Sequence, residues 1–480
     1  MFGHPRGLKT LFFTEMWERL SYYGMRALLV LFLVDSMEGG FGMSAETAGA
    51  IYGMYTALVY LLALPGGWIA DRLLGLRRSV LIGGCVIAAG HFSMAIPSAT
   101  TFYLGLILIV IGTGLLKPNI SAMVGDLYPE GGARRDAGFS IYYMGINIGA
   151  LIGPLVCGYL GEKVNWHLGF SAAGIGMVFG VIQYALGARH LPPSSGKVKT
   201  APEEYGRALR KFVVGVGIVL SVILLLALGH LKAWFPLSIE KIAGATGVFI
   251  VLVAMIYFTS ILIFGHWSKL EKKRILVILV LFFTSAVFWS GFEQAGSSMN
   301  LFANEYVDLN VLGWEMPASW LQSVNPLFII LLAPVFGWLW IWLGTRQPSI
   351  PVKFSAGLLI MGTGFLVLAW GSQYASDTTK VSSLWLIITY FLHTSGELCL
   401  SPVGMSSVTK LSPRPLVGQM MGLWFTATAL GNLMAGQMGG LFETLPLPKL
   451  FGSVFVIASG AGIILLLISR PIRRLMGDVK

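Results

Sequence analysis

The sequence predicts an all-α polytopic membrane protein. The chain has 480 residues, of which 55% are hydrophobic and 11% are charged, whereas roughly 25% of the residues in a soluble globular protein are charged. Its apolar residues form long runs that reach the ~20 residues a helix needs to cross a bilayer. Strands of a membrane barrel would alternate polar and apolar residues over about ten positions. The expected surroundings of this chain are therefore a lipid bilayer.

Fourteen membrane-spanning helices are expected. Their predicted ranges are 11–35, 45–70, 79–97, 101–123, 137–161, 166–188, 212–231, 243–264, 275–303, 319–343, 353–374, 383–408, 416–440 and 451–470. Linkers rich in proline, serine and glycine separate these ranges, as at 191–196 and 412–415. The three cysteines lie inside apolar ranges, and their spacing indicates neither a disulfide framework nor a metal site.

The basic residues predict the orientation of these helices. If the chain starts on the inner side, 25 of its 33 Lys and Arg residues fall inside, five fall outside and three lie within spans. Such a bias is typical of cytoplasmic loops, so both termini are expected in the cytoplasm. The net charge of +11 is explained by these loops, and no nucleic-acid partner is predicted.

Two spans interrupt an otherwise symmetric plan. The ranges 212–231 and 243–264 contain no central charge, and removing them leaves six helices on each side. We therefore predict an N-terminal six-helix bundle over 1–190, a linker with two inserted helices over 191–274, and a C-terminal six-helix bundle over 275–480. Residues 66–72 read GGWIADR, and Gly75 and Arg77-Arg78 follow. This loop resembles the signature of the major facilitator superfamily, whose fold has two six-helix bundles with a substrate site between them at the midplane.

Seven charged residues lie inside the apolar ranges. Even on the mild insertion scale each would cost about 2.5–3.5 kcal/mol if it stayed unpaired, so they are expected to pair with one another or to line a watery pathway. Those seven residues are Glu15, Glu18, Arg19, Arg26, Lys117, Glu293 and Glu397. The first four share one helical stripe with Tyr22 and Tyr23, and this stripe must face the interior of the bundle.

Estimated depth and repeat symmetry suggest two ion pairs between the bundles. Arg26 matches Glu293 towards the outside, and Lys117 matches Glu397 towards the inside. Such pairs could act as gates that open in alternation, and static bridging is the other interpretation. Four carboxylates face three cations, so one carboxylate is expected to exchange a proton, with Glu15 and Glu18 as candidates. Proline and glycine beside Lys117 and Glu397 suggest that those helices bend.

Three runs resemble signatures of the proton-dependent oligopeptide transporter (POT, or PTR) family. Residues 15–24 read EMWERLSYYG, residues 139–150 read FSIYYMGINIGA, and residues 292–298 read FEQAGSS. In the first run Leu20 replaces the family's usual Phe. The resemblance implies that Glu15, Glu18, Arg19 and Glu293 couple protons to transport. It also implies a substrate pocket lined by Tyr22, Tyr23, Arg26, Tyr60, Lys117, Asn147, Trp289, Glu293, Asn325, Glu397, Ser401 and Trp424.

The resemblance implies a monomeric symporter that imports di- and tripeptides with protons across the cytoplasmic (inner) membrane of a bacterium. No cofactor is expected, since the proton gradient drives such a carrier. Two alternatives stay open at this point: a proton antiporter of the major facilitator type that exports drugs or metabolites, and a small-anion carrier. No nucleophile constellation, nucleotide loop or metal-ligand spacing is present in the sequence, so an enzyme is not predicted.

Overall fold

The computed structural model describes residues 3–130, 132–198, 200–234, 236–376 and 378–477. The first part of the described chain forms α1 (Arg6–Val34), α2 (Ala45–Leu61), α3 (Ala63–Ile69), α4 (Leu76–Met94), α5 (Ala99–Asp126), α6 (Gly132–Lys163) and α7 (Trp166–Gly187). Two further helices, α8 (Pro202–Leu231) and α9 (Ile239–Phe264), precede the second part. That part forms α10 (Lys269–Phe292), α11 (Ser298–Tyr306), α12 (Val324–Leu343), α13 (Ile350–Gly371), α14 (Leu384–Leu411), α15 (Val417–Gly440), α16 (Leu447–Leu467) and α17 (Ser469–Met476).

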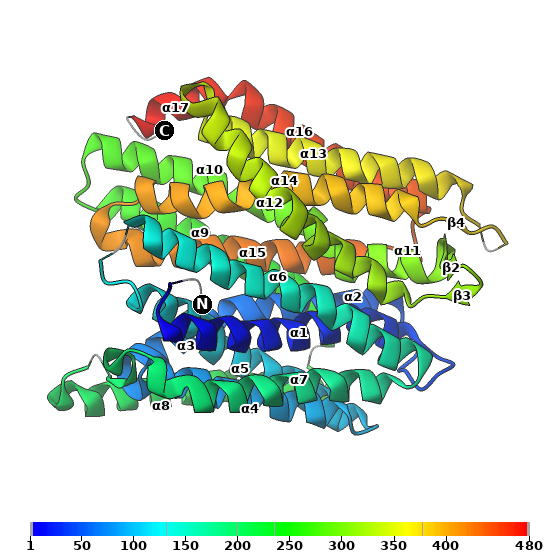
Figure 1. Cartoon of the computed structure of the whole chain (residues 1–480), viewed down its shortest axis with the longest axis horizontal. Helices are drawn as coiled ribbons and strands as arrows, with labels where there is room; N and C mark the ends of the chain where they lie inside the picture. Colours follow the sequence, from blue (N-terminus) through cyan, green and yellow to red (C-terminus); the bar gives the residue numbers. More distant parts are fainter. Residues whose placement is uncertain (1–2, 131, 199, 235, 377, 478–480) are drawn as a thin grey trace.

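The long helices lie side by side in two groups (Figure 1). Helices α1 to α7 occupy the lower half of the view, and α10, α13, α14, α16 and α17 occupy the upper half. Helix α1 begins and α17 ends at the same end of the molecule, on the left. Short strands mark the opposite end: β1 (Val307–Asp308) pairs in parallel with β4 (Val381–Ser382), and β2 (Asn310–Val311) pairs antiparallel with β3 (Trp314–Glu315).

Every predicted span coincides with helix, so the all-α expectation is confirmed. Among the described residues, ten helical segments are long and apolar enough to cross a membrane. The other four predicted spans correspond to α1, α4, α14 and α15, which have 29, 19, 28 and 24 residues and pack in the same bundles. Charged, polar and small residues lower the hydropathy of these four helices.

Two predicted spans prove to be interrupted. The range 45–70 divides at Leu62, and a π-helical turn over Ala70–Leu74 follows α3. The range 275–303 divides into α10, a 3₁₀ turn over Glu293–Gly296, and α11. Gly296 lies directly against the Tyr52 ring, where a larger residue would collide with it. By contrast, α5 and α14 continue through Pro118 and Pro402 without a break, and the predicted bending there stays a prediction.

Close glycine contacts hold helices together. Gly49 on α2 and Gly436 on α15 lie backbone against backbone, and Gly53 adjoins the same spot. Within the N-terminal group, Gly83 and Gly112 make the same kind of contact between α4 and α5. Small residues allow such approach between transmembrane helices, which explains part of the unusual glycine content.

The two inserted helices differ in their packing. Helix α8 is exposed along almost its whole length, whereas α9 packs on both α2 and α15, one helix from each bundle. Thr47 on α2 donates a 2.6 Å hydrogen bond to Glu240, and Tyr257 donates one to Gln419 on α15. The division into 1–190, 191–274 and 275–480 stays a prediction, and α9 adheres to both larger parts.

Candidate functional site

A buried network on α1 contains two carboxylates and one guanidinium. Arg19 Nη2 donates a 2.6 Å hydrogen bond to Glu18 Oε1, and Arg19 Nε also pairs with the second oxygen of that carboxylate. The same Nε lies 3.3 Å from Glu15 Oε1. All three side chains are at most 3% exposed. One cation thus serves two acidic groups.

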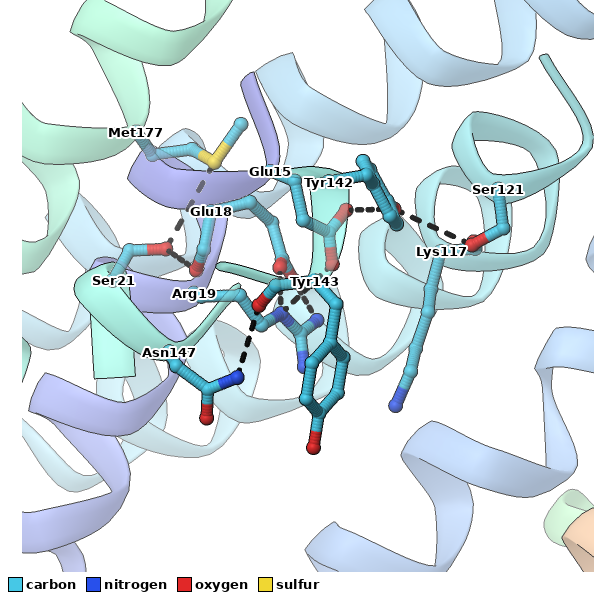
Figure 2. A network of polar contacts seen from close by, with 10 residues as sticks. All are labelled: Glu15, Glu18, Arg19, Ser21, Lys117, Ser121, Tyr142, Tyr143, Asn147 and Met177. Carbon is cyan, nitrogen blue, oxygen red and sulfur yellow. Dashed lines mark hydrogen bonds and ion pairs between the residues drawn. The ribbon is translucent and has the colours of Figure 1, made fainter. Parts of the chain in front are cut away.

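Tyr142 on α6 holds the other side of Glu15 (Figure 2). Its hydroxyl donates a 2.8 Å hydrogen bond to Glu15 Oε2 and lies 3.3 Å from the Ser121 hydroxyl on α5. Lys117, one turn earlier on α5, extends away from Glu15 in this view. The hydroxyls of α5 and α6 therefore complete a polar chain that starts at the α1 carboxylates.

The two tyrosines of the α1 stripe lie between its two arginines. Arg19 stands 4.9 Å from the centre of the Tyr22 ring, and Arg26 stands 4.9 Å from the centre of the Tyr23 ring. The rings meet edge to face with their centres 5.1 Å apart. Cations over aromatic faces are stabilised by about 0.5–2 kcal/mol. These contacts fix both guanidinium groups on the inner face of α1.

The predicted pair between Arg26 and Glu293 is formed. Arg26 Nη1 lies 2.6 Å from Glu293 Oε2, and the two side chains are 8% and 5% exposed. Glu293 stands in the turn that interrupts α10 and α11, and its carbonyl accepts a 3.1 Å hydrogen bond from the Tyr52 hydroxyl. The break in the helix therefore brings one residue from the C-terminal bundle between α1 and α2 of the N-terminal bundle.

The predicted pair between Lys117 and Glu397 is not formed in this structure. Lys117 Nζ lies over the Tyr60 ring, 4.0 Å from its centre, and no described carboxylate is within ion-pair distance of it. Glu397 is 8% exposed, and its Oε2 has no hydrogen-bond partner among the described residues. The two groups belong to opposite bundles, so this link between the bundles is absent in the structure.

The opposite side is closed by direct contacts between the bundles. Glu162 on α6 accepts hydrogen bonds of 2.7 and 3.1 Å from the backbone of Ala318 and Ser319. Trp320 Nε1 donates to the Leu155 carbonyl at 2.9 Å. These contacts lie at the strand-bearing end, together with the Arg26–Glu293 pair and the α2–α15 glycine contact. The molecule is therefore closed at that end while the Lys117–Glu397 pair is open.

Other predicted pocket residues occupy the central region with differing contacts. Asn325 on α12 donates a 2.8 Å hydrogen bond to Thr394 and lies beside Glu397. Asn147 bonds the Tyr143 carbonyl one turn back on α6 at 2.9 Å. The half-buried Trp289 has an indole N–H without a described partner. Their roles in a pocket remain predictions.

Ser401 and Trp424 are the least distinctive of the predicted residues. Ser401 is half-buried one turn beyond Glu397 on α14. Trp424 is 5% exposed and packs against Gly404 and the Phe354 ring, so its observed contacts are those of a core residue. Among the described residues, no group of His, Cys, Asp and Glu could hold a metal ion.

Three polar residues with buried hydrogen bonds, two of which join the bundles, were not singled out from the sequence. These are Tyr52, Tyr142 and Asn300, whose amide on α11 donates a 2.8 Å hydrogen bond to the Ala27 carbonyl on α1. Tyr142 lies inside the second quoted run, and the spacing of that run could have indicated it. Tyr52 and Asn300 act through backbone carbonyls, for which a single sequence offers no signal.

Comparisons with known proteins agree with this arrangement. The model of the POT family (PTR2) matches residues 77–452. The peptide transporter YePEPT of Yersinia enterocolitica is 42% identical over 499 aligned positions, which cover all of this chain and 96% of the relative. A di-/tripeptide transporter of Lactococcus lactis subsp. cremoris is 39% identical over 487 aligned positions, which cover 100% of this chain and 98% of the relative. A crystal structure of a peptide transporter POT in complex with sulfate superposes with a TM-score of 0.92 at 42% identity. The superposition covers 99% of this chain and 96% of the chain in that structure.

Proposed function

Because the chain belongs to the POT family of transporters, we propose that it imports di- and tripeptides together with protons by alternating access between its two bundles. The observation that carries the proposal is the pair of unmatched groups at the centre. Lys117 in one bundle has no described carboxylate partner, and Glu397 in the other is buried with one oxygen unpartnered. A buried charge without a partner is costly, and a zwitterionic substrate would match both groups.

Substrate binding would use the two ends of the peptide. Glu397 would receive the amino terminus, while Arg26 and Lys117 would lie near the carboxylate. The side chains of different peptides then need tolerant surroundings, which Tyr22, Tyr23 and other aromatic residues can provide. Such a site would recognise the amino terminus and the carboxylate, which all di- and tripeptides share, and could therefore bind peptides of many different sequences.

Proton coupling would use the α1 network. Glu15 and Glu18 share Arg19, so a proton on one carboxylate would leave a balanced ion pair, whereas two ionised carboxylates would leave an excess negative charge in the membrane. Burial favours the neutral form of such a group. An inward proton gradient supplies free energy, and the membrane potential adds about 2.3 kcal/mol per charge per 100 mV.

Gating would use the two pairs between the bundles. The Arg26–Glu293 pair, which is formed here at 2.6 Å, would close the outer side, and the Lys117–Glu397 pair would close the inner side in the alternate state. With the outer pair formed and the inner pair apart, the structure is assigned to an inward-facing state. Both termini would be cytoplasmic, the membrane would be the bacterial inner membrane, and the monomer would suffice for transport without catalysing a chemical reaction.

The test is dialanine uptake into liposomes that contain the pure protein, under an inward proton gradient and an inside-negative potential. We expect accumulation that a protonophore abolishes. Glu397→Gln and Lys117→Ala should each remove driven accumulation, while the exposed controls Glu38→Gln and Lys273→Ala should retain it. Near-normal accumulation by both central variants would refute the site. No uptake by folded wild-type protein would favour the exporter or the small-anion carrier.

A further inference from the structure

A separate cavity of about 890 Å³ lies within the C-terminal half of the chain, at the end where α17 stops. Its walls come mainly from the second half of α12, the start of α13, the second half of α14 and α17, and Tyr143 on α6 closes one side. None of the seven intramembrane charged residues lines it. The cavity is therefore distinct from the central ion-pair site.

Three cations line this cavity. They are Lys353 at the start of α13, Lys410 in the last turn of α14, and Arg473 on α17, and none of the described lining residues is acidic. Lys353 is only 9% exposed, and its Nζ donates a 2.8 Å hydrogen bond to Gln347 and stands 4.2 Å from the centre of the Trp340 ring. A buried cation held by neutral partners beside two further cations favours an anionic ligand.

The rest of the lining has polar residues, among them Gln347 and Ser407, and a set of apolar residues. Phe336 and Trp340 on α12 face Leu398 and Val403 on α14, and Met476 closes the end near α17. The cavity thus offers both cationic and apolar contacts to a ligand. A small hydrated anion would use only the cationic contacts, whereas an amphiphile with an anionic head and an acyl chain would use both.

The residue pattern of α17, which lines one end of the cavity, indicates that a membrane surface lies there. Its residues Ile472 and Met476 are buried while Arg473 and Arg474 are exposed, which is the pattern of a helix lying in the interface. Arg274 anchors it by donating a 3.1 Å hydrogen bond to the Met476 carbonyl. Basic pockets between membrane helices on the cytoplasmic side bind anionic lipid headgroups.

We propose that this cavity binds the phosphate-bearing headgroup of an anionic phospholipid from the inner leaflet, with Lys353, Lys410 and Arg473 around the phosphate and an acyl chain along α12 and α14. The assignment to the inner leaflet rests on the orientation given under Proposed function. A bound lipid would join α12 to α13, α14 and α17 at the end where the bundles are apart.

The proposal is tested by native mass spectrometry of detergent-solubilised full-length protein titrated with 1-palmitoyl-2-oleoyl phosphatidylglycerol. We expect one tightly retained lipid, and at least tenfold weaker retention of the zwitterionic phosphatidylcholine with the same chains. The triple variant Lys353→Gln, Lys410→Gln and Arg473→Gln should retain at least tenfold less phosphatidylglycerol. A matched control with the same change in charge replaces three exposed basic residues by Gln: Lys9, Arg207 and Lys273.

Several outcomes would overturn the proposal. Equal loss of lipid in the triple and the control variants would show only a general charge effect. Displacement of the lipid by equimolar inorganic phosphate would assign the cavity to a free anion, and displacement by dialanine would assign it to the substrate route. If the triple variant does not fold, the exposed single change Arg473→Gln should still lower retention about threefold, and unchanged retention would refute the site. No step of this test requires transport, so its result is independent of the peptide-import proposal.

Discussion

Removing the charge of Glu293 tests whether the Arg26–Glu293 pair closes the outer side. The change Glu293→Gln keeps the shape of the side chain and leaves the Tyr52 bond to the backbone carbonyl in place. It leaves Arg26, which is 7% exposed, without its 2.6 Å partner. Breaking a buried pair in this way costs about 3–5 kcal/mol. If the cost falls on the outward-closed state alone, its population relative to the outward-open state falls by roughly 100-fold or more.

The assay is a distance measurement across the outer end. Spin labels at Ser98, before α5, and at Leu312, in the β2–β3 turn, are exposed and belong to opposite bundles. The three native cysteines are first replaced, and double electron–electron resonance then gives the distance distribution in lipid nanodiscs. We expect a single short distance in the background protein, and a second, longer one that dominates in Glu293→Gln.

Two variants make the result specific to the pair. The charge reversal Arg26→Glu with Glu293→Arg should restore most of the short distance, because it rebuilds an ion pair at the same place. The exposed change Glu38→Gln removes an outer carboxylate outside the pair and should leave the distribution unchanged. An unaltered distribution in Glu293→Gln would refute the argument, because the pair would then be a static bridge that contributes nothing to closure.

Three further predictions concern neighbouring contacts. Tyr142→Phe removes the 2.8 Å hydrogen bond to Glu15, worth about 1.5–3 kcal/mol for a charged acceptor, so proton-driven dialanine uptake should fall about tenfold while counterflow without a gradient persists. Gly436→Leu puts a side chain against the Gly49 backbone, so the same spin-label pair should report an opened outer end. Asp35→Ala should lower the thermal midpoint by several degrees, because the carboxylate accepts hydrogen bonds from Met37, Glu38, Gly40 and the Trp166 indole at 2.9–3.2 Å.

The sign of the pH effect at Asp35 follows from the same contacts. Burial alone would raise the pKa of this carboxyl, but the backbone and indole donors lower it overall. Its stabilisation is therefore present above the ordinary carboxyl pKa of 3.8 and is lost as the pH falls through the lowered value. Equal midpoints for the wild type and Asp35→Ala at neutral pH would contradict this account. Equal losses of gradient-driven uptake and counterflow in Tyr142→Phe would contradict the prediction for that hydrogen bond. A closed outer end in Gly436→Leu would contradict the prediction for the glycine contact.

The sequence predicted the features that follow from long apolar runs and from the need of buried charges for partners. Runs of apolar residues located helices at all fourteen predicted ranges, since a helix in lipid must satisfy its own backbone. Estimated depth and repeat symmetry brought Arg26 and Glu293 together, because buried charges need partners. The break at Glu293–Gly296 was missed, since it depends on the fit of Gly296 against Tyr52, a residue more than 200 positions away.

The pair between Lys117 and Glu397 shows a different reason for a discrepancy. A sequence encodes every state of a transporter at once, whereas one structure presents a single state. Lys117 on the Tyr60 ring and Glu397 beside Asn325 belong to a molecule that is closed at the other end. The prediction therefore fails for this structure and is retained for the alternate state, which the distance between α5 and α14 in an outward-facing form would test.

These arrangements link substrate release to the return of the carrier. Under the proposed function Glu397 binds the peptide amino terminus and also pairs with Lys117 when the inner side closes. One carboxylate cannot satisfy both partners at once, so a bound peptide disfavours the inner pair and with it the closure of the inner side. Once Glu397 is free, Lys117 neutralises it, and the cost of an unpaired buried charge then favours closure of the inner side. The empty carrier would therefore return faster than a carrier that still holds a peptide, because the substrate and the gate compete for the same group.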